Sequence, residues 1–323
     1  MTLVVFGIDA LDPDLVDPET HPNLVLSAHR PIETINSAEG EPSTHELWPT
    51  IITGLRPPEH GLVLDDGVAW DSPILRAGSK AGDYVLPDSV QTQLGALLLN
   101  RTDEDAFRTP ASYYADNDLT TVFDGRESKA IGIPNYVVDA DSEDREHQLR
   151  REMGELFERD PEATGGHSSA DPHAFYEQCL EMAMIRTARV RRALRSRDYE
   201  LVFGYTSGLD LVGHVSYDRP QLQRRAYDEL NDFVGELRGD LGEDDELLLV
   251  IDHGLQDGLH TETAMVAATD PALVESVSSV VDVRGAIDRE LDETDHRPED
   301  RDDGDGLGDS TAVREQLEDL GYM

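Results

Sequence analysis

The sequence predicts an α/β fold, in which a central, mostly parallel β-sheet is flanked by helices on both faces. Three apolar runs have the composition of buried strands, and segments with apolar residues at helical spacing lie between them. Because strands that alternate with helices are joined by crossovers, this order favours a parallel sheet between two helical layers. At 323 residues the chain is long enough for one large domain or two modest ones.

The expected strands are continuous runs of apolar and β-branched residues. Such runs, without a polar residue at every second position, are typical of strands that are buried on both faces. The first, at residues 3–8, lies close to the N-terminus. The others are residues 199–205, residues 246–251 and the shorter run 130–133.

Two long helices are predicted from proline positions and apolar spacing. Asp171 before Pro172 is typical of an N-cap followed by proline at the first helical position, and predicts a helix from there to about residue 195. Its apolar positions are Phe175, Cys179, Met182 and Ala183. A second helix begins near Pro220, and its apolar stripe consists of Leu222, Tyr227, Leu230, Phe233, Val234 and Leu237.

Three other segments are polar. Residues 141–165 are expected to form a peripheral helix and loop, and residues 288–309 an acidic, glycine-rich loop. The aspartates of that loop do not have the spacing of a calcium-binding loop. A short helix is expected over residues 311–320, because Gly321 is suited to end it.

The charge of the chain excludes several classes of partner. Lys and Arg number 27 against 68 Asp and Glu, for a formal net charge of −41. This excess of anions excludes electrostatic binding of nucleic-acid duplexes and argues against docking on anionic lipid. Only two of the cations are lysines, and an acid-rich, lysine-poor surface indicates a halophilic protein, because molar salt shortens the screening length to about 3 Å.

The sequence has neither a membrane-spanning run nor a signal-peptide pattern, and this predicts the cellular location. No run approaches the about 20 apolar residues of a membrane span. The N-terminal apolar run is short and has no basic region before it, unlike a signal peptide. We therefore expect a cytoplasmic protein with no membrane partner.

The one cysteine, Cys179, excludes a disulfide scaffold.

Residues of metal-ligand type follow three of the expected strands. They are Asp9 after the first strand, Asp210 and His214 after the second, and Asp252, His253 and His260 after the third. Ligands of open α/β sheets bind beyond the carboxyl ends of the strands, so we expect these side chains to converge. Each residue alone is also explained by a turn, a helix cap or a surface histidine, but their coincidence at strand ends favours a metal site. Such ligands suit Zn²⁺ best, with Mn²⁺ or Mg²⁺ as alternatives.

Thr44 precedes an apolar segment that ends at Gly54. A small hydroxyl residue in this place is typical of a helix N-cap. Two interpretations remain open. Thr44 only caps the helix, or its hydroxyl points into the site, where a helix N-terminus favours an anion.

Taken together, these segments resemble the alkaline phosphatase superfamily, and most closely its type I phosphodiesterase/nucleotide pyrophosphatase branch. The resemblance rests on their order, from residue 3 to about residue 264. The matching motifs are Gly7-Ile8-Asp9, Thr44 with Trp48 to Gly54, Arg56-Pro57-Pro58-Glu59-His60-Gly61, Asp210 to His214, Asp252-His253-Gly254, and His260.

The resemblance implies an alkaline-phosphatase-like catalytic domain over residues 1–285. Residues from about 65 to 170 would include the insertions that form the substrate pocket. Residues 286–323 would form the acidic loop and the C-terminal helix. The site implied by the resemblance holds two divalent metal ions, of which Zn²⁺ is the expected one.

The resemblance also implies a role for each ligand. One ion would be held by Asp210, His214 and His260, and the other by Asp9, Thr44, Asp252 and His253. Thr44 would be the nucleophile and would form a phosphothreonine during hydrolysis of a small-molecule phosphate ester, either a diester or a monoester. His60 is expected to be structural.

Two positions depart from the family pattern. Glu46 stands where many relatives have proline, two residues after Thr44. Asp65 stands where nucleotide pyrophosphatases have an asparagine that donates to a phosphoryl oxygen, and an ionised aspartate cannot donate. The resemblance therefore implies the metal chemistry but not a nucleotide substrate.

Four alternatives belong to the same superfamily. A sulfatase is disfavoured, because residues 43–47 lack the family's C/S-x-P-x-R pattern. A cofactor-independent phosphoglycerate mutase usually has a longer chain and a serine nucleophile. Phosphoryl transfer to an acceptor other than water remains an alternative, and so does a non-catalytic metal-binding protein.

Overall fold

The computed structural model describes residues 1–37, 40–63, 109–138, 152–154, 156–160 and 162–293. Among these residues, six strands form a central sheet in the order β2-β10-β7-β1-β6-β3. The strands are β1 (Leu3–Ile8), β2 (Ala28–Glu33), β3 (Ser128–Ile131), β6 (Leu201–Thr206), β7 (Glu246–Ile251) and β10 (Thr263–Ala268). Only β10 runs antiparallel to its neighbours β7 and β2, so the expectation of a mostly parallel sheet is confirmed.

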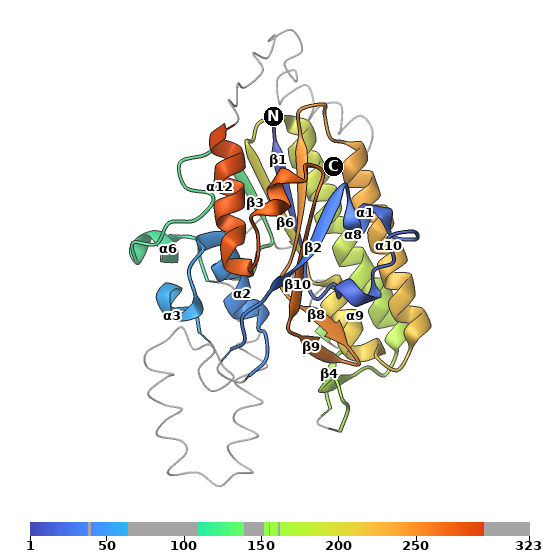
Figure 1. Ribbon diagram of the computed structural model, residues 1–323. Helices are drawn as coiled ribbons and strands as arrows, with labels where there is room; N and C mark the ends of the chain where they lie inside the picture. The colour runs from blue at the N-terminus through green and yellow to red at the C-terminus, as the bar shows by residue number, and fades with distance from the viewer. Residues whose placement is uncertain (38–39, 64–108, 139–151, 155, 161, 294–323) are drawn as a thin grey trace, which may run out of the picture.

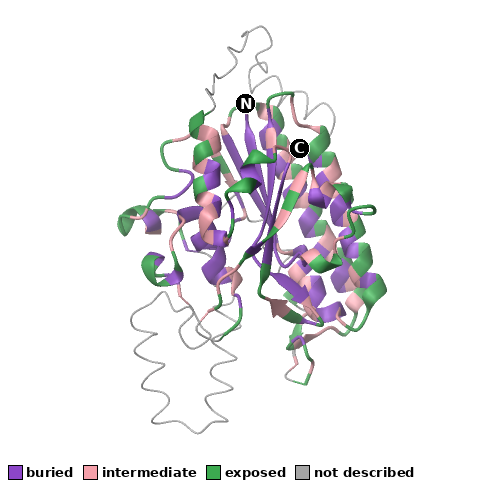
Figure 2. Cartoon of the chain, viewed as in Figure 1, coloured by how far each residue is buried: buried purple, intermediate pink, exposed green. Residues whose placement is uncertain are grey.

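Strand β1 lies inside the sheet between β6 and β7, and all six of its residues are buried. Its side chains alternate between two hydrophobic cores. Val4 and Phe6 contact one core, whereas Leu3 and Val5 contact the other. Figure 2 shows the buried sheet between helices whose outer surfaces are exposed. A strand buried on both faces explains why the run 3–8 has no polar alternation.

Helices cover both faces of the sheet (Figure 1). One layer contains α1 (Pro22–Val25), α8 (Pro172–Ser196), α9 (Gly208–Ser216) and α10 (Pro220–Gly239). The other contains α2 (Thr44–Thr53), α11 (Ala272–Glu275) and α12 (Val283–Glu293), with α3 (Pro57–His60) and α6 (Ser112–Asp116) beside them. No helix of the described residues has both the length and the apolar composition that crossing a bilayer requires.

The predicted N-terminus of the long helix α8 is confirmed. Asp171 is its N-cap and accepts a hydrogen bond from the backbone N–H of Ala174 at 3.0 Å, with Pro172 at the first position. The four apolar positions expected on this helix are all buried, and three of them belong to the core on this face of the sheet, namely Phe175, Cys179 and Met182. On α10, all six residues of the expected stripe contact the same core, with Phe233 only partly buried.

Two strands begin at other residues than expected. Pairing with β1 starts at Leu201, opposite Leu3, so β6 begins there and not at Tyr199. Strand β3 covers residues 128–131 instead of 130–133, because Gly132 takes a φ of +69° that ends the extended backbone. The apolar runs predicted these strands, whereas the pairing register set their ends.

The structure corrects the expected role of Thr44 as a helix cap. Ser43 occupies the N-cap position of α2, with extended φ and ψ, and Thr44 is the first helical residue. The Thr44 hydroxyl therefore does not cap the helix. Pro49 lies within α2 and has no N–H for the carbonyl of His45, which instead accepts a hydrogen bond from the Asn135 amide at 3.0 Å.

Helix α12 corrects the expectation of a loop from residue 288, because the chain is helical as far as Glu293. Val283, Ala286 and Ile287 of this helix are buried in the core beside α2. The boundary expected after residue 285 thus falls inside a packed helix. The helix expected at 311–320 lies outside the described residues, as do Asp65 and most of the segment 65–170. Of the expected peripheral segment 141–165, the described part includes the short strand β4 (Glu158–Arg159).

Candidate metal centre

The expected ligands converge because three neighbouring parallel strands end at the same edge of the sheet. Asp9 directly follows β1, and Asp252 directly follows β7. Strand β6 leads into α9, which contains Asp210 and His214 one turn apart. The side chains form two groups, each with ligand atoms within 4.8 Å of one another.

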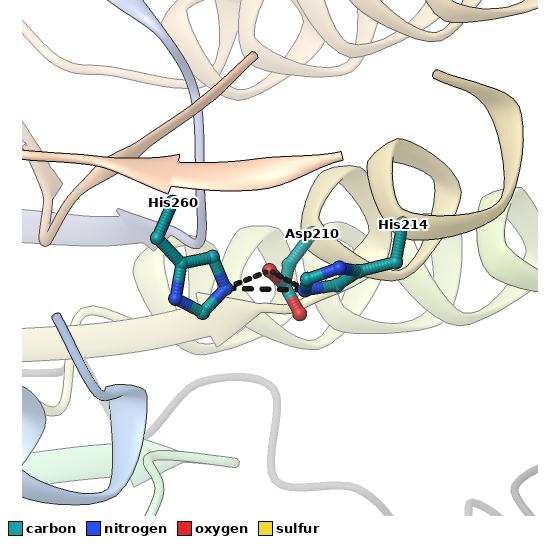
Figure 3. A group of neighbouring side chains, drawn as sticks. All are labelled: Asp210, His214 and His260. Carbon is teal, nitrogen blue, oxygen red and sulfur yellow. Dashed lines mark hydrogen bonds and ion pairs between the residues drawn. The ribbon is translucent and has the colours of Figure 1, made fainter. Parts of the chain in front are cut away.

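The first group consists of Asp210, His214 and His260 (Figure 3). The Nε2 atoms of the two imidazoles lie 3.1 Å apart. They lie 3.3 Å and 3.4 Å from Oδ1 of Asp210. Two ring nitrogens and a carboxylate oxygen directed at one point are the donor set of a divalent metal ion.

A hairpin brings His260 to this group. It consists of β8 (Gly254–Gln256) and β9 (Leu259–Thr261), with a two-residue turn at Asp257 and Gly258. Both turn residues have positive φ, as the favoured hairpin turn requires. The Nδ1 atom of His260 lies 2.9 Å from the carbonyl oxygen of Pro42, so this nitrogen donates there and Nε2 faces Asp210.

The second group consists of Asp9, Asp252 and His253, all of them buried. His253 Nε2 lies 3.3 Å from Oδ1 of Asp9 and 3.5 Å from Oδ2 of Asp252. Thr44 joins this group, with its Oγ1 3.3 Å from both Asp9 oxygens and 3.3 Å from His253 Nε2. The seven residues selected from the sequence therefore lie at two adjacent places, and the rings of His253 and His260 are 4.2 Å apart.

The buried carboxylates require positive charge to remain ionised. Asp252 is fully buried, and neither of its carboxylate oxygens accepts a hydrogen bond from the described residues. Burial and the nearby carboxylates of Asp9 and Asp210 raise the pKa of Asp252 well above its usual range. Burial, with Asp210, raises the pKa of Asp9 to about 7. A divalent cation would supply the missing charge, so this donor set fits a metal ion.

The imidazoles already supply part of that charge in the first group. Burial opposes ionisation of Asp210, but His214 and His260 outweigh it and hold the pKa of Asp210 well below its usual range. Burial lowers the pKa of His260, yet Asp210 raises it to about 9. The carboxylate between the two imidazoles is therefore ionised at neutral pH, which is the form that binds metals.

Sequence reasoning missed the residues that support the candidate ligands. Tyr205, the fifth residue of β6, donates its hydroxyl hydrogen bond to Oδ2 of Asp9. Asp12 holds the hairpin of His260, since it accepts hydrogen bonds from Gln256 at 2.9 Å and Thr261 at 3.0 Å. Tyr205 ended a predicted strand next to the ligands, and that position was the only sequence signal for it.

Two other positions singled out in the sequence are buried, and His60 has a plain structural explanation. His60 is buried, with Nε2 3.1 Å from the Thr50 hydroxyl and Nδ1 3.2 Å from the backbone nitrogen of Leu62. It belongs to neither ligand group of the described residues. Glu46 is buried within α2, where its carbonyl accepts a hydrogen bond from Thr50 at 2.9 Å.

Comparison with known proteins identifies a family. The family model described as type I phosphodiesterase / nucleotide pyrophosphatase matches residues 3–303 of the chain. A comparison with curated protein sequences finds no match.

Several solved structures are similar to this chain. Mouse ectonucleotide pyrophosphatase/phosphodiesterase 5 is 15% identical with a TM-score of 0.44, and the alignment covers 79% of this chain and 57% of the mouse chain. The alkaline phosphatase of the Antarctic bacterium TAB5 is 12% identical with a TM-score of 0.44, over 91% of this chain and 98% of that chain. The PH0037 protein of Pyrococcus horikoshii is 11% identical with a TM-score of 0.44, over 92% and 98%. These similarities are too distant to transfer an activity, and this chain spans 57% of the length of the mouse protein.

Proposed function

The chain belongs to the type I phosphodiesterase / nucleotide pyrophosphatase family, and from this premise we propose that it is a metal-dependent hydrolase of phosphate esters with Thr44 as its nucleophile. One observation supports this proposal above all others. The Thr44 hydroxyl oxygen lies 3.3 Å from Asp9 and 3.3 Å from His253, within a group of buried ligand side chains.

Each ligand group would hold one divalent ion. Asp210, His214 and His260 would bind one of them, and Asp9, Asp252 and His253, together with Thr44, would bind the other. Bound ions would supply positive charge to the phosphoryl oxygens and lower the pKa of the threonine hydroxyl. Zn²⁺ is the ion we expect, because half of the six carboxylate and imidazole ligands are histidines.

The reaction would proceed in two displacements at phosphorus. The Thr44 hydroxyl gives its proton to solvent, and its oxygen forms a bond to phosphorus while the bond to the leaving alcohol breaks. The departing oxygen takes a proton from water. Water then attacks the phosphothreonine, which restores the Thr44 hydroxyl and releases the phosphate product. Thr44 begins helix α2, whose N-terminus favours the negative charge of the phosphoryl group.

The test compares Thr44→Ala with Thr44→Ser on simple aryl phosphate esters. The protein is kept in molar salt and loaded with Zn²⁺ or Mn²⁺. We expect Thr44→Ala to lose at least about 1,000-fold in turnover, because a missing nucleophile removes the covalent pathway. Thr44→Ser keeps a hydroxyl and is expected to retain measurable turnover, and both variants should bind metal.

Further measurements separate the proposal from its alternatives. Acid-quenched protein should contain phosphorus on the peptide that includes Thr44. A monoaryl phosphate and a diaryl phosphate decide between monoester and diester preference. An aryl sulfate tests the sulfatase alternative and should be stable. Full turnover by Thr44→Ala would refute Thr44 as the nucleophile, and metal binding without any turnover would favour a non-catalytic protein.

A further inference from the structure

A cavity of about 300 Å³ adjoins the candidate metal centre. Asp9, Thr44 and Asp210 form part of its wall, so a group bound to phosphorus at Thr44 has direct access to it. No part of the proposed reaction uses the rest of this wall. Its chemistry therefore indicates which ester substituent the site accepts.

Most of the wall consists of apolar side chains from both sides of the site. Ile133 and Val137 follow strand β3, whereas Phe175 and Met182 belong to helix α8. The ring of Phe157, also in the wall, is stacked on the ring of Phe175, with centroids 5.3 Å apart and planes at 13°. Phe175 is buried and Phe157 is partly buried against the same core, so the two rings together form an apolar surface.

Polar side chains in the wall belong to the metal centre or lie beside it. The Tyr205 hydroxyl already donates its hydrogen to Asp9, and Ser207 precedes helix α9. Among the described residues that line the cavity, none is lysine, arginine, asparagine or glutamine. Side chains of these types are the usual side-chain partners of a second phosphate or of the edge of a nucleobase.

We propose, on the basis of the proposed function, that the substrate is a phosphate ester whose substituent in this cavity is apolar, either an aryl ring or a short alkyl chain. The volume agrees with such a group, since an apolar cavity of about 150 Å³ can bind benzene. The cavity has roughly twice that volume. The apolar part of the described wall binds such a group by removing it from water, whereas it offers few side-chain partners to the polar atoms of a nucleoside.

The first test uses 4-nitrophenyl phosphodiesters that differ only in their second ester group. Methyl, ethyl, butyl, hexyl and phenyl groups form the series, and the 4-nitrophenyl ester of thymidine 5′-phosphate is the large polar comparison. We expect kcat/KM to rise about fourfold for each buried methylene until the cavity is filled. The phenyl ester should be hydrolysed faster than the thymidine ester.

Variants of one wall residue test whether this cavity causes the preference. Val137→Thr introduces a hydroxyl at nearly constant volume, and Val137→Trp fills space. Both should reduce the preference for hexyl over methyl at least threefold. The methyl ester reports whether each variant is folded and active. Val138→Thr is the matched control, because Val138 is 66% exposed and does not line the cavity.

A binding experiment keeps this inference separate from the proposed function. Calorimetry compares methylphosphonate with hexylphosphonate on the metal-loaded protein, and we expect the longer chain to bind at least tenfold more tightly. Three results would each overturn the inference that the cavity takes an apolar substituent. They are equal affinities for the two phosphonates, equal kcat/KM across the ester series, and a preference for the thymidine ester. Absence of hydrolysis of every ester, with tight binding of hexylphosphonate, would instead refute the proposed function alone.

Discussion

Tyr205→Phe tests whether a hydrogen bond to Asp9, a proposed ligand, sets the metal affinity of the candidate centre. The Tyr205 hydroxyl donates to Asp9, and the residue is only 4% exposed. Its ring lies edge-on to Trp48 with centroids 4.8 Å apart, so phenylalanine keeps this packing and removes only the donor. A hydrogen bond to a charged group contributes about 1.5–3 kcal/mol. Since about 1.4 kcal/mol is a factor of ten, we expect metal to bind about 10- to 100-fold more weakly.

The assay is a competition titration of Zn²⁺ between the protein and a coloured chelator in molar salt. Tyr114→Phe is the matched control, because its buried hydroxyl donates at 2.8 Å to the backbone carbonyl of Asn135 and not to a ligand. It should lower thermal stability while the metal affinity stays within twofold. Equal zinc affinities for Tyr205→Phe and the unmodified protein would refute the claim that the Tyr205 hydrogen bond to Asp9 strengthens metal binding.

Three further predictions concern the stability of the fold. A Cβ at Gly7 would lie 2.3 Å from the Trp48 ring, so Gly7→Ala should cost about 1–3 kcal/mol in denaturant unfolding. Gly285→Ala, where a Cβ meets nothing within 4 Å, should instead be neutral or stabilising, and an equal loss in both variants would contradict this reading. Burial raises the pKa of Asp245, but hydrogen-bond donors that include Arg197 outweigh burial and lower that pKa. The ionised carboxylate therefore stabilises the fold above about pH 4, and this stabilisation is lost as acid protonates it. Unfolding curves of Asp245→Asn should therefore lose part of the acid sensitivity of the unmodified protein, and identical pH profiles would exclude this contribution. Because the net charge is −41, the melting temperature should rise steeply from 0.1 M to molar KCl by about ten degrees or more, and a melting temperature independent of salt would exclude the halophilic interpretation.

The sequence predicted an element correctly where the residue pattern of one segment was sufficient to identify it. The run at 3–8 predicted β1 with its observed bounds, because a strand buried on both faces has no polar alternation. Strands β2 and β10 were not predicted. Strand β2 lies at the sheet edge and contains Pro31 among half-exposed residues, whereas β10 is rich in alanine. Neither composition distinguishes a strand from a loop without its neighbours.

By itself, the sequence selected the candidate metal ligands of this protein, because aspartate and histidine at strand ends can be recognised from local patterns. Only the tertiary structure decided that Thr44 begins a helix beside Asp9, that the hairpin at Asp257 and Gly258 turns His260 toward Asp210, and that Tyr205 donates to Asp9. Asp9 and Tyr205 are 196 positions apart along the chain. Contacts of that kind depend on the register between strands and on the packing of helices across the sheet, and no single segment encodes either.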